Sequence, residues 1–163
     1  MRAKIIKITK YASLFFLIVI LFLAAAYFFR TDPIMMIAGK KLSGQELPYP
    51  ENWEFTNQHR TIKVETDPVD PHSVTTLCFV REGKLIIPAQ EGHTKTWPQN
   101  VLKDNRVRIK IGDGIYLVRL KLVDKDAKIS DLRPFIAIKF PNRPPLEPEE
   151  GPKDIWLFEV SPR

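Results

Sequence analysis

The stretch that decides the fold is RVRIKIGDGIYLVRLKLV, residues 106–123. Apolar and polar residues alternate on both sides of Asp113-Gly114, a dipeptide typical of a two-residue type I′ hairpin turn. A turn at this dipeptide places Ile109 opposite Val118 on the inner side of the hairpin. The stretch therefore predicts two antiparallel strands that bury one face.

The outer face of this hairpin is strongly basic. Its four cations are Arg106, Arg108, Arg119 and Lys121. The predicted register sets Arg108 opposite Arg119 and Arg106 opposite Lys121, and like charges directly opposite each other destabilise a sheet. The face therefore predicts a negative partner, which is either acidic side chains from another segment or a bound anion.

The flanking sequence predicts further strands. Val74–Val80 and Lys84–Ala89 surround a two-residue turn at Glu82-Gly83, and both segments are apolar on both faces, as in strands buried on two sides. Arg60–Thr66 alternates, and Ile155–Val160 (IWLFEV) reads as a final strand. Five or more strands with tight turns indicate a mainly β domain with short helices, a small β-barrel.

One short helix is predicted between the hairpins. Thr96-Trp-Pro-Gln99 fits a capping box in which Thr96 is the N-cap residue, and Asp104-Asn105 ends the helix. The segment Asp126–Phe140 is ambiguous, because Ser130-Asp131 favours a helix start while Pro134 interrupts it. Pro141–Lys153 contains five prolines and predicts a loop.

The loop before the predicted helix is a candidate anion site. It carries His93, Thr94, Lys95 and Thr96. The free N–H groups and the positive dipole end of a helix N-terminus favour anions, and a lysine, an imidazole and two hydroxyls add to that preference. The alternative is an ordinary capped helix that follows a polar loop.

The N-terminal segment predicts a membrane anchor. Tyr11–Phe29 is an uncharged run of 19 residues, and as a helix it would span about 28 Å, close to the ~30 Å hydrocarbon core. A cleaved signal peptide is the alternative, because Ala24-Ala25-Ala26 supplies small residues. The apolar run is longer than a signal sequence needs and continues past the alanines, so we expect an uncleaved anchor.

Flanking charges predict the orientation of this anchor. Four basic residues precede the run and three follow it: Arg2, Lys4, Lys7 and Lys10, then Arg30, Lys40 and Lys41. The positive-inside rule places the N-terminus in the cytoplasm and the domain outside it, in the periplasm of a bacterium. The expected organisation is a basic cytoplasmic tail (1–10), a transmembrane anchor (11–29), a linker or arm (30–57) and the barrel domain (58–163). Trp53 and Phe55 should dock the arm on the domain.

Composition excludes several classes of function. The net charge is +6, but residues 1–30 hold five basic residues and no acid, so the rest of the chain is near neutral and gives no indication of nucleic-acid binding. Cys78 is the single cysteine and lies in an apolar run, where a buried and inert thiol is expected. Histidines 59, 72 and 93 match no metal-binding spacing, so we expect no metal.

The order of these features resembles the flavin- and deazaflavin-binding split β-barrels related to pyridoxamine phosphate oxidase. The resemblance rests on three stretches: VTTLCFVREGKLIIPAQ, then TWPQNVLKDNRVRIKIG with its Trp97 and Asn100, and the final IWLFEVSP. The chain departs from the deazaflavin members at Thr66–Ser73, where an acidic, proline-containing segment stands in place of a Gly-Arg-Lys-Ser/Thr-Gly phosphate loop. Phosphate binding at this segment is therefore not expected.

The resemblance implies a split β-barrel, a homodimer and a flavin-dependent oxidoreductase. FMN or a deazaflavin is the implied cofactor, with FMN favoured over deazaflavin, and the residues implied to bind it are His93, Thr94, Lys95, Thr96, Trp97 and Asn100. The cofactor would carry the redox chemistry, so no catalytic side chain is named. The alternatives are a non-enzymatic binding module that keeps the barrel without a cofactor, and a structural partner of another envelope protein. The expected ligands are an anionic small molecule and, through the anchor, membrane lipid.

Overall fold

The structure is a computed structural model of the 163-residue chain. It describes residues 2–29, 31–34, 36–142, 144 and 154–163, and the side chains of residues 2–10, 26, 28 and 29 lie outside that description. The chain forms two compact units, Met1–Arg30 and Thr31–Arg163. The predicted loop Pro141–Lys153 falls mostly outside the described residues.

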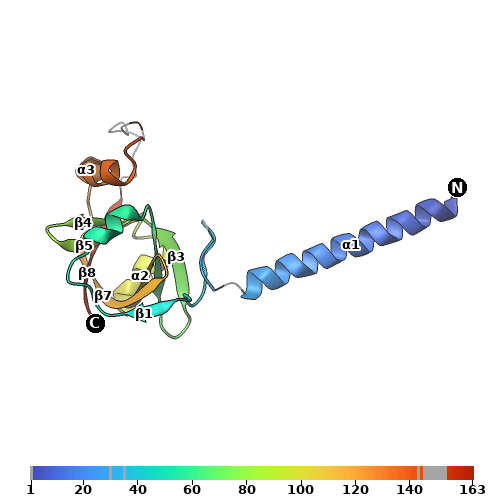
Figure 1. Ribbon diagram of the computed structural model, residues 1–163, viewed down its shortest axis with the longest axis horizontal. Helices are drawn as coiled ribbons and strands as arrows, with labels where there is room; N and C mark the ends of the chain where they lie inside the picture. Colours follow the sequence, from blue (N-terminus) through green and yellow to red (C-terminus); the bar gives the residue numbers. More distant parts are fainter. Residues whose placement is uncertain (1, 30, 35, 143, 145–153) are drawn as a thin grey trace. The chain divides into compact units, whose positions relative to one another are not determined.

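The first unit is one helix, α1 (Arg2–Phe29) (Figure 1). The large apolar side chains that are described in it are exposed, Phe15, Phe16 and Phe22 among them. Within the described part of the chain, no helix has both the length and the apolar character needed to cross a membrane. The predicted span includes residues 26, 28 and 29, whose side chains are not described, so the anchor stays a prediction.

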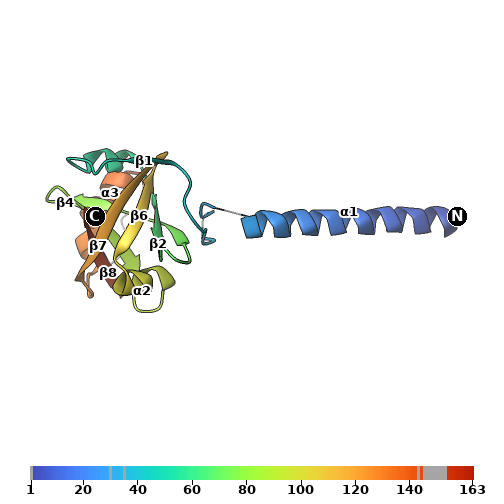
Figure 2. The same cartoon turned by 90° about the horizontal axis from the view of Figure 1, so that it is seen from below.

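The second unit is an eight-stranded sheet in the order β3-β2-β6-β7-β8-β5-β4, with β1 paired in parallel to β7. The strands are β1 (Gln45–Leu47), β2 (Ile62–Thr66), β3 (His72–Thr76), β4 (Phe79–Arg81), β5 (Lys84–Gln90), β6 (Arg106–Ile111), β7 (Gly114–Asp124) and β8 (Ile155–Pro162). They curve around a common interior, and helix α2 (Thr96–Lys103) lies across it (Figures 1 and 2). The mainly β fold with short helices is confirmed.

Two apolar clusters use opposite faces of the same strands. Leu85 and Ile87 of β5 and Phe158 of β8 belong to the inner core, whereas Ile86 of β5 and Leu157 of β8 contact helix α3 (Ile129–Lys139). The prediction that β5 is buried on both sides is therefore confirmed. Helix α3 continues past Pro134, where the sequence predicted an interruption. Its packing on this outer face of the sheet stabilises the helix despite the proline.

The first predicted hairpin is confirmed at its turn, but one of its strands is divided. Glu82 and Gly83 connect β4 and β5 with φ of 53° and 76°, the positive values that a type I′ turn requires. Residues 74–80 do not form one strand, however. The chain leaves β3 after Thr76, which pairs with β2, and enters β4 at Phe79, which pairs with β5.

The second hairpin has a different register from the predicted one. The turn residues are Gly112 and Asp113, so Ile109 faces Tyr116 and Val107 faces Val118. Gly112 has φ of 58°, whereas neither Asp113 nor Gly114 takes a positive φ, so the turn is not of type I′. The shift is by two residues, which keeps the predicted inner and outer faces. On the outer face it leaves only Arg106 opposite Arg119 as a like-charge pair.

The start of α2 also differs from the prediction. The N-cap residue is Lys95, not Thr96, and no side chain caps the helix. Gln99 donates from Nε2 to the carbonyl of Gly92 at 2.9 Å and does not close a capping box. On the apolar side of α2, Val101 is buried but Leu102 is half-exposed.

The arm contacts the sheet through β1 and packs on it through its buried residues Leu42 and Trp53. Trp53 is 1% exposed and lies among the rings of Tyr49, Phe55 and Tyr116, as expected for an arm that docks. A short 3-10 helix, η1 (Glu54–Gln58), follows it. Because the arm adds β1 to the sheet and Trp53 to the core, the compact unit begins at Thr31.

Candidate functional site

A cavity of about 510 Å³ lies in the Thr31–Arg163 unit. Residues from several parts of the unit line it: the segment 36–38 of the arm, β3 with the chain that follows it into β4, the end of β5, the loop that leads into α2, helix α3, and Ile155 at the start of β8. This volume falls within the usual range for small-molecule sites, roughly 300–1,000 Å³. The cavity is therefore the candidate binding site of this protein.

The loop before α2 forms the polar end of the cavity. Thr94, Lys95, Thr96 and Trp97 all line it. The N–H groups of Thr94 and Lys95 are taken by the carbonyl of Glu91, at 3.0 and 3.1 Å. Thr96 and Trp97 are the first two residues of α2, so their N–H groups have no acceptor within the helix. Four of the six predicted site residues thus lie together, with a lysine and a helix N-terminus.

The other two predicted residues lie outside the cavity lining. His93 pairs through Nδ1 with the carboxylate of Asp154, and this hydrogen bond holds the pKa of Asp154 below its usual value. Asn100 donates from Nδ2 to Thr66 Oγ1 at 3.2 Å. The first contact joins the loop before α2 to the residue that precedes β8, and the second joins α2 to the end of β2. His93 and Asn100 therefore hold α2 and its loop in place and do not line the cavity.

A second part of the cavity lining is apolar. Phe79 and Phe135 stack with ring centroids 4.4 Å apart, and Leu132 and Ile136 of α3 continue this wall. With Trp97, the lining contains three aromatic side chains. The arrangement suits a molecule with an aromatic body and an anionic group.

Two polar side chains lie within this wall, Cys78 and Lys139. Lys139 Nζ donates to the carbonyls of Thr56 and His59, at 2.6 and 2.8 Å, and to Cys78 Sγ at 3.6 Å. Burial raises the pKa of the Cys78 thiol, although the nearby ammonium acts in the opposite direction. Lys139 was not among the residues predicted from the sequence. A single lysine inside the apolar stretch FIAIKF was the available signal.

His72 is the remaining titratable residue at the cavity among the described residues. It is half-buried at the start of β3, and burial, followed by the charge of Lys40, lowers its pKa. The imidazole is therefore neutral near pH 7 and can accept or donate one hydrogen bond.

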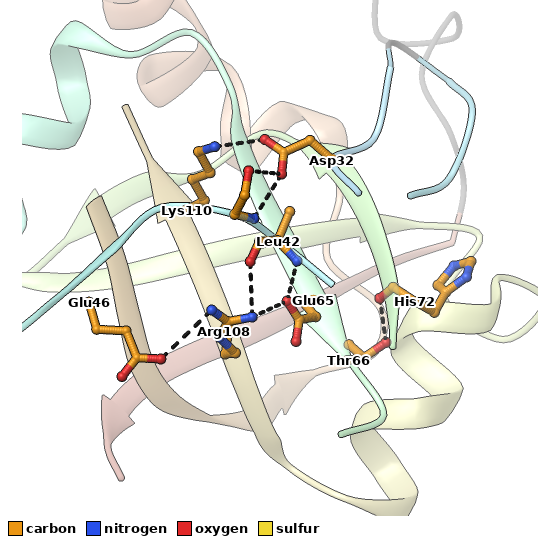
Figure 3. A network of polar contacts seen from close by, with 9 residues as sticks. Asp32, Leu42, Glu46, Glu65, Thr66, His72, Arg108 and Lys110 are labelled. Carbon is orange, nitrogen blue, oxygen red and sulfur yellow. Dashed lines mark hydrogen bonds and ion pairs between the residues drawn. The ribbon is translucent and has the colours of Figure 1, made fainter. Parts of the chain in front are cut away.

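The basic outer face of β6 meets acidic side chains, not an open anion site (Figure 3). Asp32 of the arm accepts from Lys63 and Lys110, both at 2.7 Å. Arg108 Nη1 donates to Glu65 at 2.7 Å and to the carbonyl of Leu42 at 3.1 Å, while the N–H of Leu42 donates to the same Glu65 oxygen. Of the four cations in the prediction, Arg108 therefore meets an acidic side chain of another segment, Glu65. Arg106 pairs with the nearby Asp104, and Arg119 donates to the amide oxygen of Asn105.

This network fastens the arm to the sheet. Burial raises the pKa of Asp32, but hydrogen bonds from Lys110 and Lys63 outweigh it and hold that pKa well below the usual value. The carboxylate therefore stays ionised in the folded protein down to strongly acidic pH. The contribution of Asp32 to stability is lost only as the pH falls below the ordinary carboxyl pKa toward the lowered one.

Comparisons with known proteins find structural matches only. No protein-family model matches the chain, and a search of curated proteins finds no relative. The heme storage protein HutZ from Vibrio cholerae matches with a TM-score of 0.46 and 14% identity, over 68% of this chain and 87% of that one. A NimC/NimA family protein from Clostridium acetobutylicum matches with a TM-score of 0.45 and 15% identity, over 64% and 75%. A pyridoxamine 5'-phosphate oxidase-related, FMN-binding protein from Nostoc punctiforme matches with a TM-score of 0.39 and 15% identity, over 63% and 70%. All three structures share 14–15% identity with this chain, and all three TM-scores are below 0.5.

Proposed function

We propose that the cavity binds an aromatic small molecule that carries a phosphate, and that FMN is this ligand. The observation that supports the proposal is that one cavity contains both a polar, cationic loop and apolar walls. The loop Thr94–Thr96 at the start of α2 offers groups that recognise phosphate, and the walls beyond it are aromatic and aliphatic. FMN is the candidate that the sequence resemblance names.

The residues present fit such a ligand in their chemistry. Lys95 supplies a full positive charge, and the N–H groups of Thr96 and Trp97 supply donors at the positive end of the helix dipole. Trp97, Phe79 and Phe135 supply aromatic side chains to the lining, next to which a planar ring system would lie. FMN would supply hydride or single-electron transfer, while this chain's residues would hold and orient it and keep water from its ring.

The first test uses two ligands that differ by one phosphate, FMN and riboflavin. We expect Lys95→Ala to weaken FMN binding by tenfold or more, since a charge-assisted hydrogen bond contributes about 1.5–3 kcal/mol and ~1.4 kcal/mol is a factor of ten. Riboflavin binding should be unchanged. Titration calorimetry of the full chain in a non-ionic detergent measures both affinities.

The matched control is Lys103→Ala. This variant removes a lysine from the same helix at its C-terminal end, and Lys103 does not line the cavity. It should leave both affinities unchanged. If wild-type protein binds neither FMN nor inorganic phosphate at millimolar concentration, the FMN proposal is wrong and the module without a cofactor becomes the better interpretation.

We further propose that α1 anchors the protein in a membrane, with the N-terminus in the cytoplasm and the second unit outside it. The support is the uncharged run Tyr11–Phe29 together with the exposure of its described apolar side chains, which have no protein surface to cover them within their own unit. The homodimer implied by the resemblance likewise stays a prediction.

The anchor predicts the behaviour of the full chain in a bacterial host. We expect it to stay with the membrane fraction after a wash in alkaline carbonate, because a spanning helix resists conditions that release peripheral proteins. Mass spectrometry should find Met1 retained, or only Met1 removed. A mature chain that begins near Tyr27 would instead identify a cleaved signal peptide.

A further inference from the structure

The amino group of Lys139 lies at the cavity with no charged partner among the described residues. The residue is 6% exposed, on a helix that closes one side of the cavity. Its donors reach the carbonyls of Thr56 and His59 and the sulfur of Cys78. None of the ion pairs formed by the described residues includes Lys139.

All three acceptors around this ammonium are uncharged. Two are backbone carbonyls, and the third is a thiol that burial keeps protonated. A buried cation without an anion carries a desolvation cost that neutral acceptors offset only in part. The weakest of the three contacts is the 3.6 Å contact to Cys78 Sγ, since sulfur is a poor acceptor. Both residues of this contact line the cavity.

We propose that Lys139 is an anion anchor inside the cavity, which binds a carboxylate, sulfonate or phosphate oxygen of an aromatic ligand at the position now next to Cys78. The proposal rests on the proposed function in one respect, that the cavity binds small aromatic molecules. It adds a second cationic position on α3, formed by residues other than those of the α2 loop. The ligand class that it names is an aromatic acid.

The contacts of Lys139 at the end of α3 explain why this lysine can bind an anion. The two carbonyl contacts fix the ammonium against η1 and the chain after it, so its location does not depend on a flexible stem. Lys95, at the α2 loop, is exposed and carries no such contact in the described structure. A fixed, desolvated charge interacts with an anion more strongly than a solvated one does.

The experiment uses two probes of the same shape, 1-naphthoate and the neutral 1-naphthamide, titrated by calorimetry into the full chain in a non-ionic detergent. Wild-type protein should bind the carboxylate at least tenfold more tightly than the amide. In Lys139→Met this preference should fall to about onefold while amide binding is kept, because the apolar walls are unchanged. Lys103→Met, outside the cavity, should retain the full preference.

Cys78→Asp provides a second variant in which Lys139 keeps its carbonyl contacts. The new carboxylate would stand where the sulfur does and neutralise the ammonium, so the preference for naphthoate should be lost and the fold retained. This variant decides the question if Lys139→Met does not fold.

Several results would overturn the anchor. Equal binding of both probes by the wild type would do so and leave the aromatic cavity intact. A preference for naphthoate over naphthamide that survives in a folded Lys139→Met or Cys78→Asp variant would also contradict the proposal. The same holds if this preference disappears in Lys95→Met alone. If neither probe binds the wild type, the proposal that the cavity binds aromatic molecules and the proposal that Lys139 binds their anionic group are both wrong.

Discussion

Glu65→Leu is expected to lower the free energy of unfolding by about 3–5 kcal/mol, because it removes the closer and buried one of the two carboxylates that pair with the Arg108 guanidinium. The other carboxylate, that of Glu46, is exposed and lies 3.7 Å away. The side chain of Glu65 is 5% exposed and that of Arg108 is 16% exposed, so water cannot replace the lost partner. Glu65 also accepts the N–H of Leu42 at 2.6 Å, and this donor would lose its acceptor as well. Denaturant unfolding followed by tryptophan fluorescence measures the change, since Trp53, Trp97 and Trp156 are all buried.

Two further variants distinguish the stability effect of losing the buried Glu65–Arg108 pair from the effect of losing any charged residue. Asp70→Asn breaks the exposed ion pair with Lys40 and should change stability by less than about 1 kcal/mol. The double variant Glu65→Leu with Arg108→Met should recover much of the loss, because replacing both members of a buried pair with apolar residues leaves no unpaired charge. A Glu65→Leu protein as stable as the wild type would show that Arg108 is compensated elsewhere.

The same variant should release the arm. The N–H and C=O of Leu42 are both held by the pair, one by Glu65 and the other by Arg108 (Figure 3). Hydrogen exchange at the Leu42 amide is therefore expected to be faster in Glu65→Leu at denaturant concentrations where the sheet is still folded. Unchanged exchange at Leu42 would place the stability loss in the sheet instead of the arm.

Gly92→Ala is expected to destabilise the protein by about 1–3 kcal/mol, the range for overpacking a close-packed site. A Cβ at this position would overlap the ring atoms Cγ and Cδ2 of Trp156 and its Cβ. Trp156 is buried in the inner core, so the ring has no space to move. Denaturant or thermal unfolding measures the loss, and weaker FMN binding should accompany it, since Gly92 precedes the loop that lines the cavity.

A double-variant cycle identifies the cause. In a Trp156→Leu background, the additional cost of Gly92→Ala should be smaller than in the wild type, because the smaller side chain leaves room for the new methyl group. The stability losses of Gly92→Ala and Trp156→Leu would simply add if Gly92 acted only through its backbone freedom. An unchanged stability of Gly92→Ala itself would mean that the loop moves away from Trp156 without cost.

The sequence by itself determined the inner and outer faces of the strands in residues 106–123. The alternation in residues 106–123 needs only local sterics and a buried side, and the structure has the predicted inner and outer residues. The burial of Trp53 and of both faces of β5 followed from the cost of leaving such residues in water. The location of Thr94–Trp97 beside a helix start also followed, because that signal is contained within a few residues.

The tertiary structure decided what depends on residues far apart in the chain. In Gly112-Asp-Gly114 either glycine can take a positive φ, and only the pairing of β6 and β7 with their neighbours selects Gly112. Pro134 lies inside α3 because packing on β5 and β8 outweighs its local cost. Lys139 meets Thr56 and Cys78 across 83 and 61 residues of sequence, and no local pattern encodes such contacts. A buried charge is located by the whole fold, since its environment consists of side chains and carbonyls that only folding brings together.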